Sequence, residues 1–244
     1  MKCIILAADQ GVRPDTTTPV IPASLLPVKG APVISYILSR LSRIDSIRSI
    51  YIVAGSRFKE RINNAACVST VNFPIVVIDN GVKSNRKMRG SLGDLLFACS
   101  QAGVSDDFLV IGADNLFSFN LGNFIESAKK SGRLLTVGLY NTNGRLKPSK
   151  FGFAAIDSEG KLTSFTEKPS SMNGSRLIST SIYFFSKENI PLINKYLLTV
   201  KASAAIGSYV EWLSQKNSVG GYVFKGSWFD VADSDAYHEA IFSF

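Results

Sequence analysis

The sequence contains very little of the residue types that most often perform acid–base and nucleophilic chemistry. It has one histidine, His238, and three cysteines, Cys3, Cys67 and Cys99, among 244 residues. A Ser-His-Asp or Cys-His catalytic set therefore has no support, and His238 is expected to be a surface or packing residue. The cysteines are odd in number and widely spaced, which predicts buried free thiols in a reducing, cytoplasmic compartment, with neither a disulfide framework nor a zinc site.

Long apolar runs are absent as well. No apolar stretch approaches the roughly 18 residues of a membrane span, and the apolar start of the chain is too short for a signal peptide, so no membrane partner is expected. Lysine and arginine number 27 against 19 aspartate and glutamate, which favours an anionic partner. Nucleic acid is disfavoured because interleaved aromatic residues and known motifs are missing. Phosphorylated small molecules and an acidic surface remain open as partners, and an ordinary solvated basic surface remains open as the structural alternative.

Apolar runs alternate with segments of helical periodicity in the first half of the chain. The pattern predicts strands at 2–8, 49–54, 73–78, 107–112 and 134–139, and helices at 32–43, 58–66, 91–101 and 121–131. Strands separated by helices of this length form βαβ units and a mostly parallel sheet.

The second half of the chain has a different pattern. Strands at 151–156, 161–165, 178–185 and 220–225, with helices near 187–198, 203–216 and 234–242, predict an antiparallel or mixed lobe. We therefore expect a Rossmann-like α/β fold with a mixed, mostly parallel sheet flanked by helices. Residues 1–244 are expected to form a single domain, with a nucleotide-facing N-terminal half and a C-terminal half that faces the second substrate.

Ligands of open parallel sheets bind beyond the carboxyl ends of the strands, where residues 9–13, 79–91 and 113–115 are expected to meet. In the first of these segments, Gly11 permits close approach to a phosphate and Arg13 is suited to clamp one. Asp114 follows a buried strand and is a natural Mg²⁺ ligand, although an Asx turn or a helix cap is the structural alternative. Asp230 is a second candidate ligand, with a cap of the last helix as its alternative.

The order of several short motifs resembles that of the sugar-1-phosphate nucleotidylyltransferases, in particular the glucose-1-phosphate thymidylyltransferase-like NDP-sugar pyrophosphorylases. The matching landmarks run from residue 4 to residue 240: Leu6-Ala7-Ala8-x-x-Gly11-x-Arg13, Pro22-x-x-Leu25-Leu26-Pro27-Val28-x-Gly30-x-Pro32-Val33-Ile34, Gly90-Ser91-Leu92, Asp114-Asn115, Phe151-Gly152, Phe165-Thr166-Glu167-Lys168-Pro169, Ser181-Ile182-Tyr183-Phe184-Phe185, Trp228-Phe229-Asp230-Val231 and Tyr237-x-x-Ala240. Any one of them is weak evidence, and their shared order makes the match specific.

The resemblance implies a nucleotide-diphospho-sugar transferase fold and a reaction between a nucleoside triphosphate and a sugar-1-phosphate, such as glucose-1-phosphate, that gives an NDP-sugar and pyrophosphate. It implies catalytic roles for Arg13, Asp114 and Lys168, and a Mg²⁺ ion held by Asp114 and Asp230. The implied substrate contacts are Leu6, Ala8, Gly11, Gly90, Asn115, Gly152 and Glu167. No general base is needed, because a phosphate monoester is already an anionic nucleophile and positioning with charge stabilisation suffices. A homo-oligomer is left open.

The chain departs from the family pattern at four positions. Asp9 stands where the family usually has Gly, Ala23 where it has a phosphate-contacting Lys, and Ala113 and Ala232 where it has Gly. Loss of one preorganised stabilising group typically costs about 3–4 kcal/mol of transition-state stabilisation. A catalytically weakened homologue that binds nucleotide or nucleotide-sugar as a regulatory or partner subunit is therefore the alternative function.

A basic run from Lys83 to Arg89 offers one way to replace the missing charge. It lies on a predicted loop at the same edge of the sheet, so it would approach the triphosphate from there. A solvated basic loop is the competing interpretation.

Overall fold

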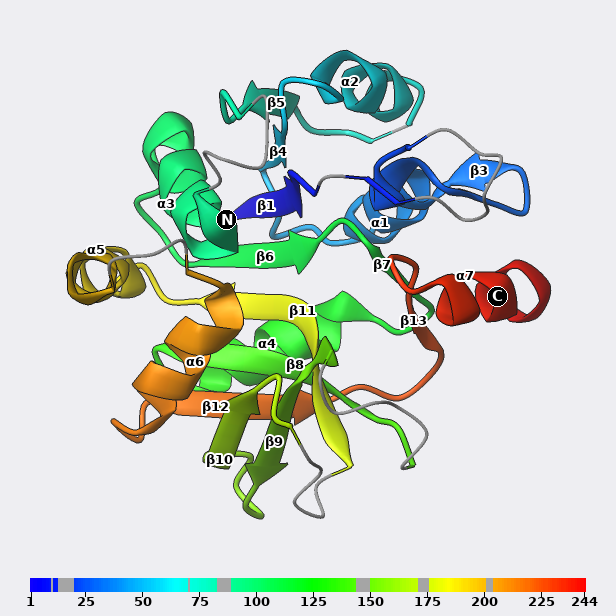
Figure 1. The fold of residues 1–244 in the computed structure, drawn as a ribbon. Coiled ribbons are helices and arrows are strands. Elements are labelled where there is room, and N and C mark those ends of the chain that lie inside the picture. The colour runs from blue at the N-terminus through cyan, green and yellow to red at the C-terminus, as the bar shows by residue number, and fades with distance from the viewer. Residues whose placement is uncertain are drawn as a thin grey trace.

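The computed structural model describes residues 1–9, 11–12, 20–69, 71–82, 89–143, 150–170, 176–200 and 204–244. Within these ranges, four strands from the first half of the chain lie side by side and parallel, in the order β5-β4-β1-β6 (Figure 1). They are β1 (Lys2–Ala7), β4 (Ser49–Ala54), β5 (Ile75–Asp79) and β6 (Phe108–Gly112). The helices α1 (Val33–Leu41), α2 (Lys59–Cys67), α3 (Gly90–Ala102) and α4 (Leu121–Ser131) occur in the same half. The predicted βαβ pattern is confirmed.

The second half extends the same sheet with antiparallel strands. β11 (Leu177–Phe185) pairs antiparallel with β6, and β9 (Gly152–Ile156) and β10 (Leu162–Glu167) follow it outward. β8 (Leu135–Asn141) pairs antiparallel with β11, and β12 (Val219–Val223) pairs parallel with β8, which completes a nine-stranded sheet. The remaining helices are α5 (Asn189–Thr199), α6 (Ile206–Ser214) and α7 (Ser234–Ser243). The expected Rossmann-like mixed sheet is present.

Each face of the sheet carries its own core, because alternate residues of a strand point to opposite faces. Ile5 of β1 packs into a cluster with residues of α1, α2, α4 and α7. Its neighbour Ile4 packs into a second cluster with residues of α3, α5 and α6, which lie together on the left in Figure 1. Both clusters contain strand residues that are fully buried, as expected for parallel strands covered on both faces.

Several short elements were not predicted, because two or three residues are too few to show a period. They are the 3₁₀ turn η1 (Ala23–Leu25), the strand pair β2 (Pro27–Val28) and β3 (Ala31–Pro32), and the strand pair β7 (Asn115–Phe117) and β13 (Trp228–Asp230). In the last pair, Asp230 stands opposite Asn115. This antiparallel register brings two segments more than 100 residues apart in sequence to the end of β6.

The cysteine prediction was partly wrong. All three cysteines are free, and Cys3 and Cys99 are buried, but Cys67 is exposed. It is the last residue of α2, whose buried residues are Ile62 and Ala66, so its side chain falls outside the buried stripe of that helix. His238 is exposed on α7, as expected. None of the helices in the described part of the chain has the length and apolar character needed to cross a membrane.

Candidate functional site

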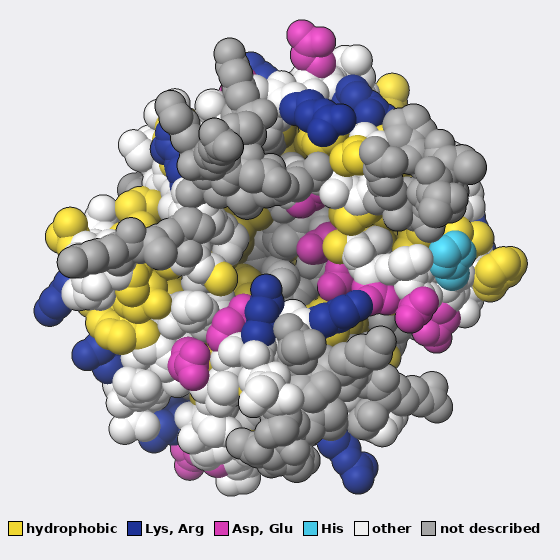
Figure 2. All heavy atoms as spheres, in the orientation of Figure 1, with side chains coloured by type: hydrophobic (Ala, Val, Ile, Leu, Met, Phe, Trp, Pro, Cys, Tyr) yellow, Lys and Arg dark blue, Asp and Glu magenta, His cyan; other side chains and the backbone are white. Residues whose placement is uncertain are grey.

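A cavity of about 380 Å³ lies beyond the carboxyl ends of β1 and β6 and is lined by residues from both halves of the chain. Figure 2 shows a hollow in this face, with acidic side chains along it and basic side chains at its lower rim. The polar side chains that line the cavity are Asp9, Ser91, Asp94, Asp114, Asn115, Lys150, Glu167, Lys168, Ser179, Ser181, Tyr183 and Asp230. Five carboxylates thus face two lysines among the described lining residues, and the cavity is acidic although the chain is basic.

Asp114 and Asp230 come together because β7 pairs with β13. The Val231 amide donates to the Asp114 carbonyl at 2.9 Å, directly after the Asp230–Asn115 pair of the register. Burial raises the pKa of both carboxyls, and the charge of Asp114 raises that of Asp230 further, to about 7. The Ala232 amide and the charges of Lys150 and Lys168 act in the opposite direction on Asp230. Two close carboxylates of this kind cannot both ionise freely without a cation nearby.

Asn115 orients Asp114. Its side-chain amide donates to the Gly112 carbonyl at 2.9 Å and to Asp114 Oδ1 at 3.1 Å. Its oxygen accepts from Trp228 Nε1 at 2.6 Å. Asn115 is 1% exposed, so its hydrogen-bonding groups are engaged within the protein, and substrate contact by this residue stays a prediction. Gly112 leaves the space this arrangement needs, since a Cβ there would lie 2.7 Å from Asp114 Oδ1.

Asp9 is a third carboxylate in the same part of the cavity. The Gly11 amide donates to its Oδ1 at 2.6 Å. Burial is the main reason that the pKa of Asp9 rises to about 6; the charge of Asp114 also raises it, while the Gly11 and Ala23 amides lower it. Asp9 therefore lies within electrostatic reach of the Asp114 carboxylate, and the Ala23 amide that also acts on it belongs to a fully buried residue.

Glu167 is held between two glycines from different elements. A Cβ on Gly207 of α6 would lie 1.9 Å from Glu167 Oε2, and a Cβ on Gly152 of β9 would lie 2.9 Å from the same oxygen. Burial raises the pKa of Glu167, while the charge of Lys168 lowers it. Gly207 was not predicted from the sequence. Its only signal is a glycine in the first turn of a helix, a poor residue for that position.

Two residues of the cavity wall have left-handed backbone conformations that non-glycine residues seldom adopt. Lys168 has φ 47° directly after β10, and Ser181 has φ 58° at the irregularity in the pairing of β11 with β8. Ser179 Oγ and the Tyr183 hydroxyl are hydrogen-bonded at 3.1 Å across this irregularity. Strained backbone of this kind concentrates at binding sites, and both residues line the same cavity as Asp114.

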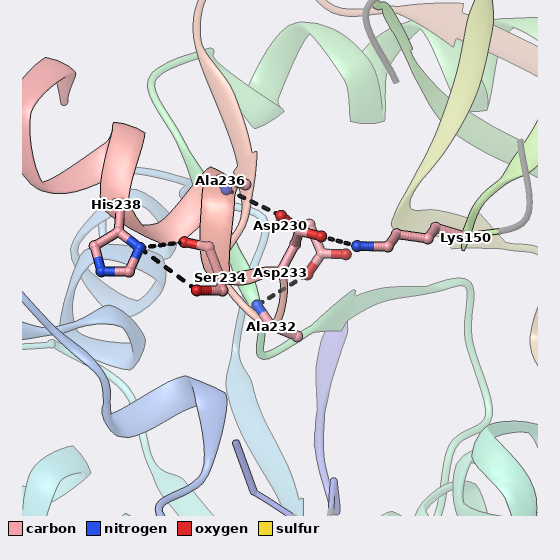
Figure 3. Close-up of polar contacts among 7 residues, drawn as sticks. All are labelled: Lys150, Asp230, Ala232, Asp233, Ser234, Ala236 and His238. Atoms are coloured by element: carbon pink, nitrogen blue, oxygen red, sulfur yellow. Dashed lines mark hydrogen bonds and ion pairs between the residues drawn. The ribbon is translucent and has the colours of Figure 1, made fainter. Parts of the chain in front are cut away.

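Lys150 is anchored at the rim of the cavity. It forms an ion pair with Asp233, which also caps α7 by accepting from the Ala236 amide at 3.0 Å (Figure 3). Asp230 accepts from the Ala232 amide at 3.0 Å in the same view. Asp233 thus provides the helix cap that was the structural alternative for Asp230, which leaves the Asp230 side chain at the cavity.

Most of the sequence-predicted residues meet at this cavity. Leu6, Ala8, Gly90, Asp114, Asn115, Gly152, Glu167, Lys168 and Asp230 all line it. Gly11 does not; at φ 81° it turns the chain so that Val12 can pair with Ile21. Arg13 and residues 83–88 of the basic run lie outside the described residues, so their proposed roles stay predictions.

The donor set fits a hard divalent cation that shares its ligands with phosphate. Among the described residues, no group of three or more His, Cys, Asp or Glu side chains is arranged to hold a metal ion alone. Mg²⁺ is commonly bound by only one or two carboxylates plus substrate phosphates. Asp114 and Asp230 each use Oδ1 for a hydrogen bond within the chain, and no hydrogen bond from the described residues falls on either Oδ2.

The nine-stranded sheet, with a cavity beyond the carboxyl ends of its parallel strands, places the chain among Rossmann-like α/β proteins. A family model described as nucleotidyl transferase matches residues 2–243. The chain therefore belongs to the nucleotidyl transferase family.

Individual relatives agree with this assignment. The chain is 25% identical over 239 residues to the bifunctional protein GlmU of Methanococcus aeolicus, covering 95% of this chain and 51% of that protein. It is 28% identical over 208 residues to UTP–glucose-1-phosphate uridylyltransferase of Synechocystis sp., covering 79% and 51% respectively. The chain thus spans about half the length of these curated relatives. A putative glucose-1-phosphate thymidylyltransferase from Bacillus anthracis has the same fold, with a TM-score of 0.77, 23% identity and coverage of 98% and 93%.

Proposed function

We propose that the chain joins a nucleoside triphosphate to a sugar-1-phosphate, glucose-1-phosphate being the first candidate, and releases pyrophosphate. This proposal rests on the observation that one cavity contains Asp114, Asp230 and the Glu167–Lys168 pair, which come from three separate regions of the sequence. In this reaction a phosphate oxygen of the sugar phosphate forms a bond to the α-phosphorus. The bond from that phosphorus to the bridging oxygen breaks, and pyrophosphate leaves with the electron pair.

The order of residues along the sheet supports a division of the cavity. Gly90 and Ser91 come from α3, which packs against β1 and β4, so they suit the nucleotide. Gly152 and Glu167 come from β9 and β10 at the other end of the strand order, so they suit the sugar and its phosphate. This division agrees with the proposed nucleotide-facing and sugar-phosphate-facing halves of one domain.

Lys168 and Glu167 have complementary roles in this proposal. Lys168 supplies a positive charge for a phosphate, since its charge already reaches both Asp230 and Glu167. Glu167 accepts hydrogen bonds from sugar hydroxyls, because an ionised carboxylate is an acceptor only. The two glycines that hold it fix its position before the sugar binds.

Mg²⁺ would be held by Asp114 and Asp230, with Asn115 fixing the orientation of the first. When bound, it neutralises charge on the phosphate oxygens during the displacement. The five carboxylates of the described lining would otherwise oppose a triphosphate strongly. The free cysteines agree with the proposed cytoplasmic location.

Pyrophosphate release from a panel of triphosphates and hexose-1-phosphates, with Mg²⁺, tests this proposal. We expect turnover with at least one pair, loss of about 100-fold or more in Asp114→Asn, and no change in the control Asp106→Asn, which removes an exposed carboxylate away from this cavity. Triphosphate binding by calorimetry without turnover of any pair would refute catalysis and identify a weakened homologue.

A further inference from the structure

The cavity contains a buried carboxylate that the proposed chemistry does not use. Asp94 lies on α3, one turn after Gly90, and is only 7% exposed although it lines the cavity. A carboxylate in such a place is costly unless it is paired. The hydrogen bonds that Asp94 makes within the protein, and the acceptor sites that remain on its carboxylate, therefore indicate which ligand it recognises.

Asn80 holds the Asp94 carboxylate by a side-chain hydrogen bond. The Asn80 backbone amide donates to the Ala54 carbonyl at 3.0 Å, and its side-chain oxygen accepts from the Val82 amide at 3.0 Å. Its side-chain nitrogen must then point away from Val82, and it donates to Asp94 Oδ1 at 3.1 Å. Asn80 is 3% exposed, so Asp94 Oδ1 is held by a buried amide that is itself fixed by the backbone.

The charge of Asp94 is supported, but the carboxylate is not saturated. Burial raises its pKa, while the Asn80 hydrogen bond and the charge of Arg89 lower it. The Arg89 guanidinium lies over the Phe97 ring, 4.4 Å from its centroid. No hydrogen bond from the described residues falls on Asp94 Oδ2, and Oδ1 accepts only the one from Asn80. Each carboxylate oxygen has two lone pairs, so both oxygens retain acceptor capacity for a ligand.

The place of Asp94 in the cavity matches the base of the nucleotide. In the proposed reaction the phosphates would meet at Asp114, which follows β6, and the sugar phosphate would extend toward Glu167 on β10, since both residues line the cavity. The nucleotide would then extend the opposite way, toward α3, which packs on β1 and β4. Asp94 stands on that side of Asp114, so it would meet the part of the triphosphate farthest from the phosphates.

We propose that Asp94 is the specificity-determining residue for the base and selects guanine. This inference rests on the proposed function. Guanine presents two adjacent N–H donors, N1–H and the N2 amino group, which match the two oxygens of a carboxylate. Uracil and thymine present one N–H flanked by carbonyl oxygens, and adenine and cytosine present an amino group next to a ring acceptor. Each would bring an acceptor toward Asp94, and sites built for hydrogen bonding reject such ligands strongly.

The test compares kcat/KM for GTP, ITP, ATP, CTP, UTP and dTTP with one accepted sugar-1-phosphate, in the unaltered chain and in Asp94→Asn. ITP lacks only the N2 amino group, so it measures that contact without altering the protein. We expect GTP to be preferred and ITP to be about 10- to 100-fold poorer, the loss of one hydrogen bond to a charged group. In Asp94→Asn, which places an amide donor at the base, we expect the GTP-to-UTP ratio to fall by about 100-fold. Glu126→Gln on α4, an exposed carboxylate outside the cavity, is the matched control and should leave the ratio unchanged.

The outcomes separate this inference from the function on which it rests. Preference for UTP or dTTP, or equal use of GTP and ITP by the unaltered chain, refutes the role of Asp94 while leaving the transferase reaction intact. An unchanged base ratio in Asp94→Asn refutes it as well. If no triphosphate is turned over or bound, the proposed function itself is wrong. Because the ITP comparison uses the unaltered protein, a folding defect in the variant cannot obscure the answer.

Discussion

Replacement of Gly207 by alanine separates activity from stability at this site. The added methyl carbon would lie 1.9 Å from Glu167 Oε2 and 2.3 Å from its Cδ, against an ordinary contact of about 3.4 Å. The start of α6 is held in place because the Ile206 amide donates to Ser91 Oγ at 3.0 Å. The Glu167 side chain must therefore move, by about 1.5 Å if the helix stays where it is.

This change should affect stability little and activity strongly. Alanine in a helix is favoured over glycine by about 0.5–1 kcal/mol, which offsets the cost of moving one flexible side chain, so the unfolding midpoint should change by no more than a few degrees. Misplacement of a positioning group by about 1 Å costs roughly 100-fold in rate, equal to about 2.7 kcal/mol of transition-state stabilisation. We expect kcat/KM for the sugar-1-phosphate to fall by that factor while the fold is retained.

A double-mutant cycle with Glu167→Ala tests whether Gly207 acts through Glu167. In the Glu167→Ala background, Gly207→Ala should cost little further activity, because the group that it displaces is gone. Gly122→Ala is the matched control: Gly122 is also the second residue of its helix, α4, and its added Cβ would approach nothing closer than Asn120 Oδ1 at 3.0 Å. Equal losses from Gly207→Ala in both backgrounds would refute the reasoning, as would full activity of the single variant.

Three further predictions concern the carboxylates and their supports. Trp228→Phe leaves the buried Asn115 oxygen without its donor, so urea unfolding should show a loss of about 1–3 kcal/mol; an unchanged midpoint would contradict this. Because the pKa of Asp230 rises to about 7 and that of Asp9 to about 6, the native state retains protons that the unfolded chain releases. The free energy of unfolding of the metal-free protein should thus fall as pH rises from about 4 to 7, by on the order of 5 kcal/mol, and Asp230→Asn should flatten the profile. Asp9→Asn keeps the acceptor for the Gly11 amide but removes a charge, so calorimetry at pH 8 should show triphosphate binding several-fold tighter; weaker binding would indicate that Asp9 contributes favourably.

The regular elements could be predicted from the sequence because their signals are local. The helix α4 was predicted with its observed bounds; Asn120 caps its start by accepting from the Gly122 amide at 2.7 Å, and Gly132 ends it with φ 61°. The strand β4 was also predicted with its observed bounds, since its apolar run is bounded by polar residues and glycine. Each of these signals lies within the segment that it defines.

The assembly of the site could not be predicted in the same way. The pairing of β7 with β13 joins segments more than 100 residues apart through only three residues each. The contact between Gly207 and Glu167 joins α6 to the end of β10, and neither residue carries a signal of the other. The sequence predicts that Asp114 follows a strand. That Asp230 lies next to it depends on the pairing of β7 with β13, which no local hydrophobic pattern encodes.

The two departures from the family pattern at Asp9 and Ala23 lie next to each other in the structure, because the Ala23 amide reaches the Asp9 carboxylate. Asp9 adds a carboxylate whose pKa is raised by burial and then by the charge of Asp114. Relative to the family pattern, this end of the cavity has therefore gained one negative charge and lost one positive charge. A triphosphate entering it meets a more negative field, which a cation held by the carboxylates would offset in addition to Lys150 and Lys168. Triphosphate binding by this chain should consequently depend on divalent metal more steeply than it would in a member with Gly and Lys at these two positions, and Asp9→Asn should reduce that dependence.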